Sequence, residues 1–310
     1  MLSVVAPVFN EEGTVDELHR RVMAAVAPLG PYEIVIVDDG STDGTWERLR
    51  ALAATDSNLR LLRLSRNFGH QIALTAGLDE ARGDAVICID GDLQDPPEVI
   101  PELVARWQEG YDVVYGVRER REGETRFKLA TASLFYKGIN RMSPVDIPAQ
   151  AGDFRLLSRR ALDALREMPE RARFLRGMTS WIGFRQTGVP YAREARFAGS
   201  TKYPLRRMLR FASDAVTSFS TTPIRFVTVL GFVTVLLCLV ALVWTLYLRL
   251  FTEQTIQGWT SVVVVVLFLG GVQLVSLGII GQYVGRIFDE VKGRPLYVVD
   301  ERIEGGASER

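Results

Sequence analysis

Two long uncharged runs near the C-terminus constrain the fold of this chain more than any other feature. Residues 226–248 and 258–285 are runs of 23 and 28 residues without one charged side chain. Each run exceeds the ~20 residues that a helix needs to cross the ~30 Å hydrocarbon core of a bilayer. A single run of this kind could be the buried core helix of a soluble protein. Two runs joined by nine residues instead favour a hairpin of two transmembrane helices.

The charges that flank these runs predict their orientation. Cations cluster outside the hairpin, at Arg206, Arg207, Arg210, Arg225, Arg286, Lys292 and Arg294. The connecting loop carries only Arg249 and Glu253. Because positive charge marks the cytoplasmic side, we expect both termini in the cytoplasm and a short external loop. We expect no signal peptide, since the apolar stretch at residues 2–8 is short and polar residues follow it at once.

Composition separates the hairpin from a charged domain at residues 1–222. The whole chain has 37 Lys and Arg against 37 Asp and Glu, so no net charge favours nucleic acid as a partner. Its two cysteines, Cys88 and Cys238, fall in an apolar strand pattern and in the first uncharged run. We therefore expect neither a disulfide nor a zinc site.

The N-terminal domain alternates strand and helix patterns. Short runs rich in Val, Ile and Leu predict strands at residues 3–8, 33–37, 59–64, 85–89, 112–115 and 185–191. Amphipathic stretches at residues 15–26 and 45–54 predict helices, with Thr14 and either Thr42 or Asp43 as capping residues. This alternation indicates an α/β fold with a mostly parallel sheet and helices on both faces.

Polar clusters follow three of these strands. The first strand ends in Phe9-Asn10-Glu11, the second in Asp38-Asp39-Gly40-Ser41, and the fourth in Asp90-Gly91-Asp92. Ligands of open α/β sheets bind outside the carboxyl ends of the strands, so we expect the three clusters to meet at one edge. Asp90 and Asp92 are one residue apart and would point the same way, which suits Mg²⁺ or Mn²⁺ bound beside a substrate phosphate. A solvated acidic turn is the alternative for this pair taken alone.

A metal-bound diphosphate beside a base pocket is the chemistry of a nucleotide-sugar site. Phe9 could cover a nucleobase or simply pack in the core, and Asp39 could accept a base N–H or cap the next helix. Gln94 could add a neutral metal ligand or order a metal-bound water. Asp153, which we expect at a turn before an apolar run, could be a base, an orienting carboxylate or a cap. His70, at an expected helix start, is either structural or at the donor edge, and we assign it no catalysis.

Cations and an amphipathic segment complete the candidates. Guanidinium and ammonium groups that could hold an anionic acceptor are Arg118, Arg126, Arg196 and Lys202, each of which could equally be a solvated surface cation. Residues 118–126 suit a mobile loop over the site or a solvated connector. Between residues 205 and 219, apolar residues fall on one helical face with arginines opposite. That pattern is typical of a helix in the membrane interface, although a surface helix packed on the sheet is the alternative.

Four motifs of the chain resemble those of glycosyltransferase family 2. They are Ala6-Pro-Val-Phe-Asn-Glu11, Val37-Asp-Asp-Gly-Ser-Thr-Asp43, Asp90-Gly-Asp-Leu-Gln-Asp-Pro96 and the Arg196–Tyr203 segment with its Gly199, Thr201 and Lys202. Within the family they are similar to polyprenyl-phosphate glycosyltransferases, the group of bactoprenol glucosyltransferases and dolichol-phosphate mannose synthase. The stretch from Trp181 to Gln186 and the two apolar runs match the bactoprenol branch. The usual D-A-D appears here as D-G-D, which leaves both carboxylates intact.

The resemblance implies a role for each candidate residue. Nucleotide binding maps onto Pro7, Phe9, Glu11, Asp39 and Asp90. The metal, Mg²⁺ or Mn²⁺, would be held by Asp90, Asp92 and Gln94. Asp153 is the candidate base, with Asp92 the second catalytic carboxylate, and Arg118, Arg126, Arg196 and Lys202 would bind phosphates.

The resemblance also implies a fold and a reaction. We expect a GT-A fold that transfers a sugar, with inversion, from a nucleotide sugar to undecaprenyl phosphate at the cytoplasmic face of a bacterial inner membrane. UDP-glucose is the expected donor, and GDP-mannose, UDP-galactose, UDP-N-acetylhexosamine and UDP-aminoarabinose derivatives are the alternatives. Similar bactoprenol enzymes are homotetramers with exchanged C-terminal strands, a role that would suit residues 296–299. A processive polysaccharide synthase and an inactive membrane scaffold are the competing hypotheses.

Together these features predict four regions. They are a cytoplasmic glycosyltransferase domain at residues 1–202, an interfacial helix at 203–222, two membrane helices within 223–285 (about 226–248 and 259–284) and a cytoplasmic tail at 286–310.

Overall fold

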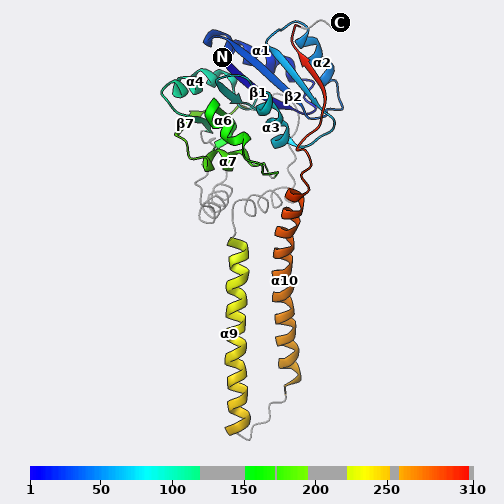
Figure 1. Cartoon of the computed structure of the whole chain (residues 1–310), viewed down its shortest axis with the longest axis vertical. Coiled ribbons are helices and arrows are strands. Elements are labelled where there is room, and N and C mark those ends of the chain that lie inside the picture. Colours follow the sequence, from blue (N-terminus) through cyan, green and yellow to red (C-terminus); the bar gives the residue numbers. More distant parts are fainter. Residues whose placement is uncertain (119–150, 172, 195–221, 252–257, 307–310) are drawn as a thin grey trace. The chain divides into compact units, whose positions relative to one another are not determined.

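The computed structural model describes residues 1–118, 151–171, 173–194, 222–251 and 258–306 (Figure 1). The chain divides into two compact units. Among the described residues, one unit holds an α/β sheet domain that includes the C-terminal residues 294–306, and the other holds two long helices. The expected interfacial helix at 203–222 lies outside the described residues, except for its last residue. The charged loop that follows Arg118 also lies outside them.

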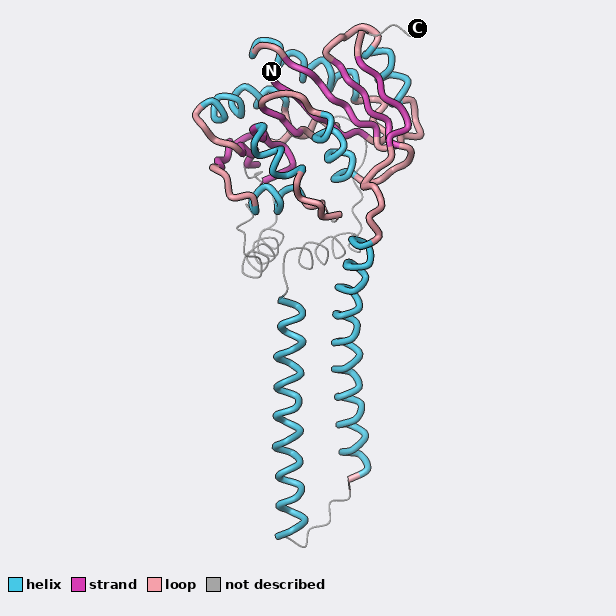
Figure 2. The backbone as a smooth tube through the Cα atoms, in the orientation of Figure 1, coloured by secondary structure: helices cyan, strands magenta, loops and turns pink. Residues whose placement is uncertain are grey.

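The sheet domain has eight strands in the order β7-β5-β6-β4-β1-β2-β3-β8 (Figure 2). The strands are β1 Leu2–Val8, β2 Tyr32–Asp38, β3 Leu59–Leu64, β4 Ala85–Cys88, β5 Val113–Arg118, β6 Ala151–Ser158, β7 Gln186–Tyr191 and β8 Val299–Glu304. The helices are α1 Val15–Val26, α2 Thr45–Ala53, α3 His70–Glu80, α4 Ile100–Gln108, α6 Arg159–Arg166 and α7 Leu175–Trp181, with short 3₁₀ turns η1 Ala27–Leu29 and η2 Pro97–Val99.

The central strands β4, β1, β2 and β3 are parallel, as the strand–helix alternation predicts. Strands β1, β2 and β4 are buried on both faces, which explains why their sequences are mostly apolar runs instead of alternating ones. The sheet as a whole is mixed, because β6 pairs antiparallel with both β4 and β5, and β8 pairs antiparallel with β3. The α/β fold is confirmed, with a GT-A-like mixed sheet.

Alternate residues of each strand face the two helical layers. Leu2, Val4, Ala6 and Val8 of β1 belong to the core under α1, α2 and α4. The odd-numbered face packs against α3, where a Cβ on Gly77 would lie 2.3 Å from Val5 Cγ1 and 3.0 Å from Val37 Cγ2. Only a glycine allows α3 to lie this close to the sheet.

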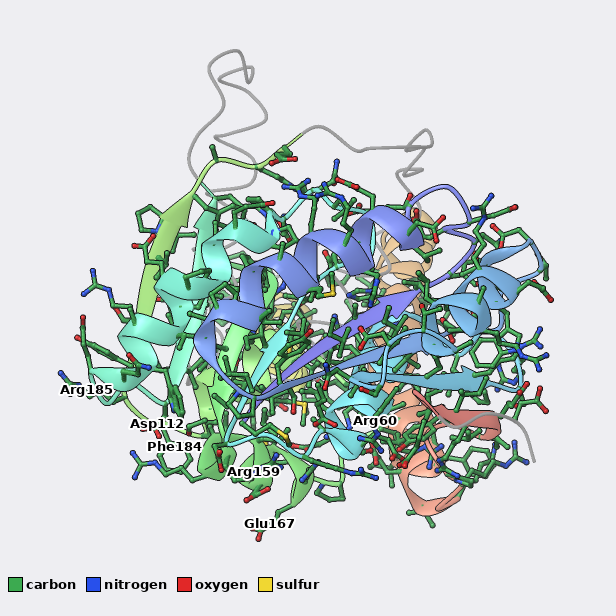
Figure 3. All side chains as sticks on the ribbon, turned by 90° about the horizontal axis from the view of Figure 1, so that it is seen from above. Arg60, Asp112, Arg159, Glu167, Phe184 and Arg185 are labelled. Atoms are coloured by element: carbon green, nitrogen blue, oxygen red, sulfur yellow. The ribbon has the colours of Figure 1, made fainter. Side chains whose placement is uncertain are left out.

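Arginines hold the C-terminal end of α3 and the edge at which the parallel strands begin. Arg166 Nη2 donates to the carbonyls of Leu78 and Asp79 at 2.6 and 2.7 Å, which satisfies acceptors left open at a helix end. Arg60 pairs with buried Glu33 at 3.1 Å, and Asp112 pairs with Arg160. Figure 3 shows Arg60, Asp112 and Arg159 along this same edge.

The last strand of the sheet comes from the C-terminus. We expected a strand near residues 296–299, whereas β8 spans Val299–Glu304 and pairs with β3 of the same chain. Trp46 Nε1 donates to Glu301 Oε2 at 3.2 Å, and Arg302 and Glu304 pair with Glu80 and Arg82. Exposed charged residues (Asp300, Arg302 and Glu304) alternate with half-buried residues along β8, which suits an edge strand with one solvated face. Four of its six residues are charged, so no apolar pattern marked the strand.

The second unit consists of helices α9 Thr222–Phe251 and α10 Trp259–Val291. At 1.5 Å per residue, the 30 residues of α9 extend about 45 Å. Among the described residues, Phe268–Val291 is the one segment long and apolar enough to span a bilayer, and α9 contains a shorter apolar segment, Val227–Ala241. One candidate span is therefore found where two were expected.

Candidate active site

The polar clusters that follow β1 and β2 are joined by hydrogen bonds. The N–H of Asp39 donates to the carbonyl of Val8 at 2.9 Å, and the N–H of Asn10 donates to Ser41 Oγ at 2.9 Å. Asn10 has a φ of 55°, a left-handed conformation that asparagine tolerates. The predicted meeting of the first two clusters at one sheet edge is confirmed.

The third cluster lies beside them because β4 is the other neighbour of β1. Val5 pairs with Cys88, and the N–H of Ile89 donates to the carbonyl of Val5 at 3.0 Å. A Cβ on Gly91 would lie 2.8 Å from the carbonyl oxygen of Pro7. The backbone after β4 therefore runs directly against the end of β1, and it carries Asp90 and Asp92 to this edge.

We expected Asp153 at a turn, whereas it reaches the site from within strand β6. It lies within the strand Ala151–Ser158, whose antiparallel register pairs Cys88 with Arg155. Continuing that register by two residues places Asp153 opposite Asp90. Sequence patterns could not give this position, because strand order and register are long-range properties of the sheet.

Asp153 is a buried carboxylate with several hydrogen-bond donors. Arg176 of α7 donates from Nε to Oδ1 at 2.9 Å and from Nη2 to Oδ2 at 3.3 Å, and Gln71 Nε2 donates to Oδ2 at 2.9 Å. Burial alone would raise the pKa of Asp153, but the hydrogen bond with His70 and the charge of Arg176 hold it well below its usual range. Asp153 is therefore ionised at neutral pH.

His70, the first residue of α3, lies between the two facing carboxylates. Its Nε2 is 3.3 Å from Asp90 Oδ1 and 3.4 Å from Asp153 Oδ2. Burial alone would lower the pKa of His70, but its hydrogen bond with Asp153 and the charges of both carboxylates raise that pKa to about 9. Burial, with the charges of Asp153 and other carboxylates, raises the pKa of Asp90 to about 6, against the opposing effect of His70.

The residues around Asp90 fit a divalent cation. The ligand atoms of His70, Asp90 and Asp153 lie within 4.8 Å of one another. Asp90 Oδ1 is buried and makes no hydrogen bond among the described residues, although His70 Nε2 lies 3.3 Å away. Carboxylate oxygens are ligands that Mg²⁺ and Mn²⁺ prefer, and a divalent cation bound here would replace His70 as the charge that compensates Asp90.

Asp92 and Gln94 lie in the tight loop that follows. Leu93 between them is buried and has a φ of 57°, which is uncommon for a residue with a branched side chain. This conformation turns Leu93 into the core and leaves its two neighbours partly exposed. Asp92 Oδ1 accepts the N–H of Gln94 at 3.1 Å, and Gln94 Oε1 accepts a hydrogen bond from Arg193. Backbone strain of this kind concentrates at functional sites.

The residues expected to bind the nucleotide line the neighbouring loops. Pro7 is buried in β1, and Phe9 directly after the strand is 43% exposed. Asp39 is buried and accepts the N–H groups of Phe68 and Gly69 at 2.7 and 2.9 Å, so it fixes the loop before α3 and does not cap α2. Burial raises the pKa of Asp39, which these backbone hydrogen bonds oppose. Glu11 Oε2 accepts a hydrogen bond from Thr14 Oγ1 at 3.0 Å.

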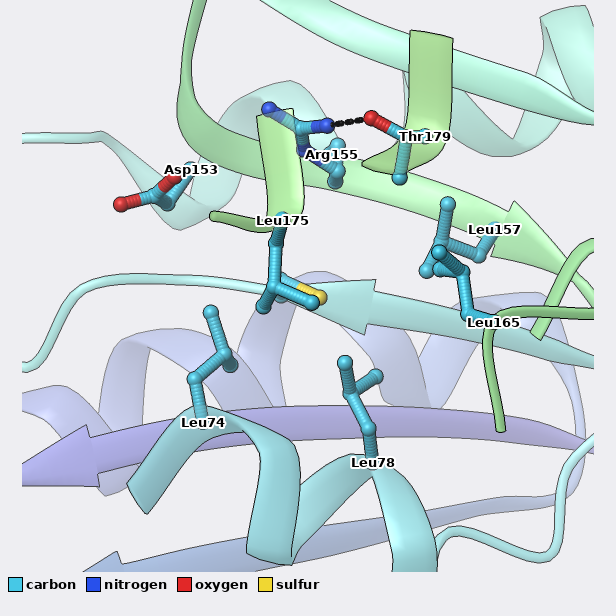
Figure 4. A pocket seen from close by; sticks show the side chains of 9 residues that line it. Leu74, Leu78, Asp153, Arg155, Leu157, Leu165, Leu175 and Thr179 are labelled. Carbon is cyan, nitrogen blue, oxygen red and sulfur yellow. Dashed lines mark hydrogen bonds between the residues drawn. The ribbon is translucent and has the colours of Figure 1, made fainter. Parts of the chain in front are cut away.

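Behind Asp153, β6 lines a closely packed apolar region that has no room for a water molecule (Figure 4). The region is lined by Asp153, Arg155 and Thr179 together with the apolar side chains Leu74, Leu78, Cys88, Leu157, Leu165 and Leu175. The Arg155 guanidinium is buried, donates to Thr179 Oγ1 and donates to the Gly152 carbonyl at 2.8 Å. The charge of this buried guanidinium also favours the ionised form of Asp153.

Of the cations expected to bind phosphates, Arg118 is the one among the described residues. It ends β5 and is 27% exposed, with its Nη2 3.4 Å from Asp95. Arg126, Arg196 and Lys202 lie outside the described residues.

Several residues of the site had no signal in the sequence. Arg176, Gln71 and Tyr191 make contacts that depend on tertiary packing alone, with Tyr191 Oη donating to Asp95. His70 was noted but given no catalytic role, although it lies between two acidic site residues. Asp95 belongs to the D-x-D stretch, yet nothing in the sequence distinguishes it from a solvated turn residue.

Comparisons with known proteins identify the family of this chain. The family model described as glycosyl transferase family 2 matches residues 3–166. An uncharacterized glycosyltransferase, YkcC, of Bacillus subtilis is 46% identical over 96% of this chain and 93% of its own length. The SfII prophage-derived bactoprenol glucosyl transferase of Shigella flexneri is 42% identical over 98% of this chain and 99% of its own. A prophage bactoprenol glucosyl transferase homolog of Escherichia coli is 41% identical over 96% and 98%.

Among solved structures, glucosyl-3-phosphoglycerate synthase from Mycobacterium tuberculosis, in complex with Mn²⁺, UDP and phosphoglyceric acid, has a TM-score of 0.47 and 24% identity. The match covers 70% of this chain and 76% of that one. The family match covers more than half of this chain, and the relatives align over nearly all of it. The chain is a glycosyltransferase and belongs to glycosyltransferase family 2.

Proposed function

We propose that this protein transfers glucose from UDP-glucose to undecaprenyl phosphate, with inversion at the anomeric carbon. The observation that carries the proposal is the facing pair Asp90 and Asp153 at the carboxyl edge of the parallel strands, in a chain 42% identical to a bactoprenol glucosyl transferase over 98% of its length. The pair supplies a cation site and a fixed anion beside the loops expected to bind the nucleotide. The sugar and the nucleotide rest on the relatives, because no donor-specific contact is described.

In the proposed reaction, the lipid phosphate replaces UDP at the anomeric carbon of the sugar. An oxygen of the lipid phosphate forms a bond to the anomeric carbon while the bond from that carbon to the β-phosphate oxygen of UDP breaks. A divalent cation, when bound, would supply Lewis-acid stabilisation of the negative charge that develops on the departing diphosphate. Asp90 and Asp92 are proposed to hold it, with Gln94 oriented by Arg193 at the rim of the loop.

Asp153 is better suited to orienting the reactants than to taking a proton. A phosphate monoester has a second pKa of ~6, so the acceptor is already an anionic nucleophile at neutral pH. The hydrogen bonds and charges around Asp153 keep it ionised and lower its basicity. We propose that Asp153 holds His70 and Arg176 in place around the reacting sugar, with Phe9 and Asp39 at the nucleobase.

The membrane arrangement is part of the proposal. We propose that α9 and α10 both span the cytoplasmic membrane and that both termini are cytoplasmic, which fits the cations that flank the hairpin. We also propose a homotetramer, on the basis of the bactoprenol resemblance. Cysteine labelling from either side of sealed vesicles tests the topology, and native mass spectrometry of the detergent-solubilised chain tests the assembly.

Direct assay of the full chain in nanodiscs tests the reaction. With UDP-[¹⁴C]glucose, undecaprenyl phosphate and Mg²⁺ or Mn²⁺, we expect radioactive glucose in the lipid extract and none with EDTA. Asp90→Asn should abolish the product, whereas Asp84→Asn should not, because Asp84 is an exposed carboxylate before the same strand. Polymer made without the lipid acceptor would favour a processive synthase. Failure with every nucleotide sugar of a panel would favour a scaffold.

A further inference from the structure

Asp95 is a fully buried carboxylate that the reaction as described does not use. It lies five residues after Asp90, at the end of the D-x-D loop, and its side chain has no exposed surface. Tyr191 Oη donates to its Oδ1, and Arg118 Nη2 lies 3.4 Å from both of its oxygens. Arg193 Nε lies 3.9 Å from the same carboxylate. Asp95 therefore joins the D-x-D loop to the ends of β5 and β7.

The guanidinium of Arg118 is fixed on three sides. Its Nε donates to Tyr191 Oη at 3.1 Å, and its Nη2 faces Asp95. On the third side it lies against the backbone of Gly152, where a Cβ would come within 2.8 Å of Nη2 and 3.2 Å of Cζ. Gly152 directly precedes Asp153 in β6, so this arrangement holds Arg118 beside a residue of the active site.

The arrangement leaves Arg118 able to bind an anion. Its Nη1 makes no hydrogen bond within the described part of the chain, and 27% of the side chain is exposed. Asp95 and Tyr191 contact Nη2 and Nε of Arg118, so Nη1 is the nitrogen that remains for an anion. A guanidinium with its rotamer already fixed loses less entropy when it binds a phosphate.

We propose that Asp95 and Gly152 form a seat that positions Arg118 for the acceptor phosphate, which makes Asp95 a positioning residue of the transfer reaction. This inference rests on the proposed function, in which a lipid phosphate is the acceptor. Its rival is a purely structural ion pair. The same sheet offers a matched example, since buried Asp112, directly before β5, pairs with Arg160 at the opposite edge.

The test compares four variants of the full chain in nanodiscs, Arg118→Ala, Asp95→Asn, Gly152→Ala and the control Asp112→Asn. For each we would measure kcat, the KM for undecaprenyl phosphate, the KM for UDP-glucose and Tm. The first three should raise the acceptor KM by about tenfold or more, the effect of one lost charge-assisted contact, and leave the donor KM within about twofold. Asp112→Asn should lower Tm without changing either KM. A shift of Asp153 in Gly152→Ala would instead appear as a lower kcat.

Chemical rescue separates positioning from folding. Free guanidinium ion should restore acceptor binding to Arg118→Ala, because Asp95 and Gly152 still form the seat. It should fail in Arg118→Ala combined with Asp95→Asn or with Gly152→Ala. If Asp95→Asn does not fold, Gly152→Ala still tests whether the position of Arg118 determines the acceptor KM.

Two results would overturn the inference in distinguishable ways. If Arg118→Ala raises the acceptor KM while Asp95→Asn and Gly152→Ala change only Tm, the seat is wrong and the proposed function stands. If Arg118→Ala leaves the acceptor KM unchanged, Arg118 does not bind the acceptor and the seat has no function. Absence of lipid-linked product with the native chain would instead refute the proposed function itself.

Discussion

Replacing Asp153 by asparagine separates an orienting carboxylate from a general base. The side chain keeps its shape but loses its charge, so Arg176 and buried Arg155 lose their shared anion. One oxygen can still accept from Arg176 Nε. The new amide group must face Gln71 Nε2 or His70, both of which contact the carboxylate in the native chain.

The structure sets the size of the expected losses in stability and in turnover. Breaking a buried ion pair costs about 3–5 kcal/mol. Arg176 is 24% exposed and keeps one hydrogen bond, so we expect a smaller loss of about 2 kcal/mol. In a domain of this size that corresponds to a fall in Tm of roughly 4–8 °C. Misplacement of His70 and Arg176 should slow turnover on the order of 10²-fold.

The decisive assay measures turnover of native chain and Asp153→Asn at pH 6.5 and pH 8.0 with saturating substrates. The acceptor phosphate is already ionised, so we expect the fold loss at pH 8.0 to be at least as large as at pH 6.5. Any larger loss at pH 8.0 would come from His70, whose pKa falls when the charge of Asp153 is removed. A general base contributes typically 10²–10⁴-fold, and its absence should matter less at pH 8.0, where solvent takes the proton more readily. A markedly smaller loss at pH 8.0 would therefore refute the orienting role. Asp163→Asn, at an exposed carboxylate of α6, is the control and should behave as the native chain.

Three further changes have clear expected results. Phe9→Ala should raise the KM for UDP-glucose by roughly 5- to 150-fold with little change in Tm, because base stacking on an aromatic ring contributes ~1–3 kcal/mol. An unchanged KM would exclude Phe9 from the base pocket. Electron paramagnetic resonance should detect Mn²⁺ bound to the native chain and much weaker binding to Asp90→Ala. Equal binding to both chains would show that Asp90 is not a metal ligand. Gly77→Ala should lower Tm, because a Cβ 2.3 Å from Val5 costs about 1–3 kcal/mol against a helix-propensity gain of ~1 kcal/mol. A higher Tm would contradict the close packing of α3.

The sequence was sufficient for those parts of the fold that depend on local patterns. The helix at Val15–Val26 and the strand at Leu59–Leu64 have the expected bounds, because apolar periodicity and the end of each apolar run mark them. The edge where Asp39 and Asp90 lie followed from the general rule for parallel sheets. Each of these inferences needed only neighbouring residues.

Contacts between distant residues could not be predicted. Asp153 faces Asp90 only because β6 runs antiparallel beside β4, and that pairing is a property of the assembled sheet. The hydrogen bond between Tyr191 and Asp95 joins residues 96 positions apart. The β8 strand was misplaced by a few residues because its charged, alternating sequence resembles a solvated tail.

The pairing of β8 with β3 constrains the order in which the sheet can form during synthesis. During synthesis, β3 emerges from the ribosome more than two hundred residues before Val299–Glu304 has been made. Until then its outer edge has no strand beside it, and unpaired edges are sites of misassembly. Both long apolar helices, α9 and α10, are translated in the interval. The nascent chain can therefore complete its sheet only after these two helices have been synthesised.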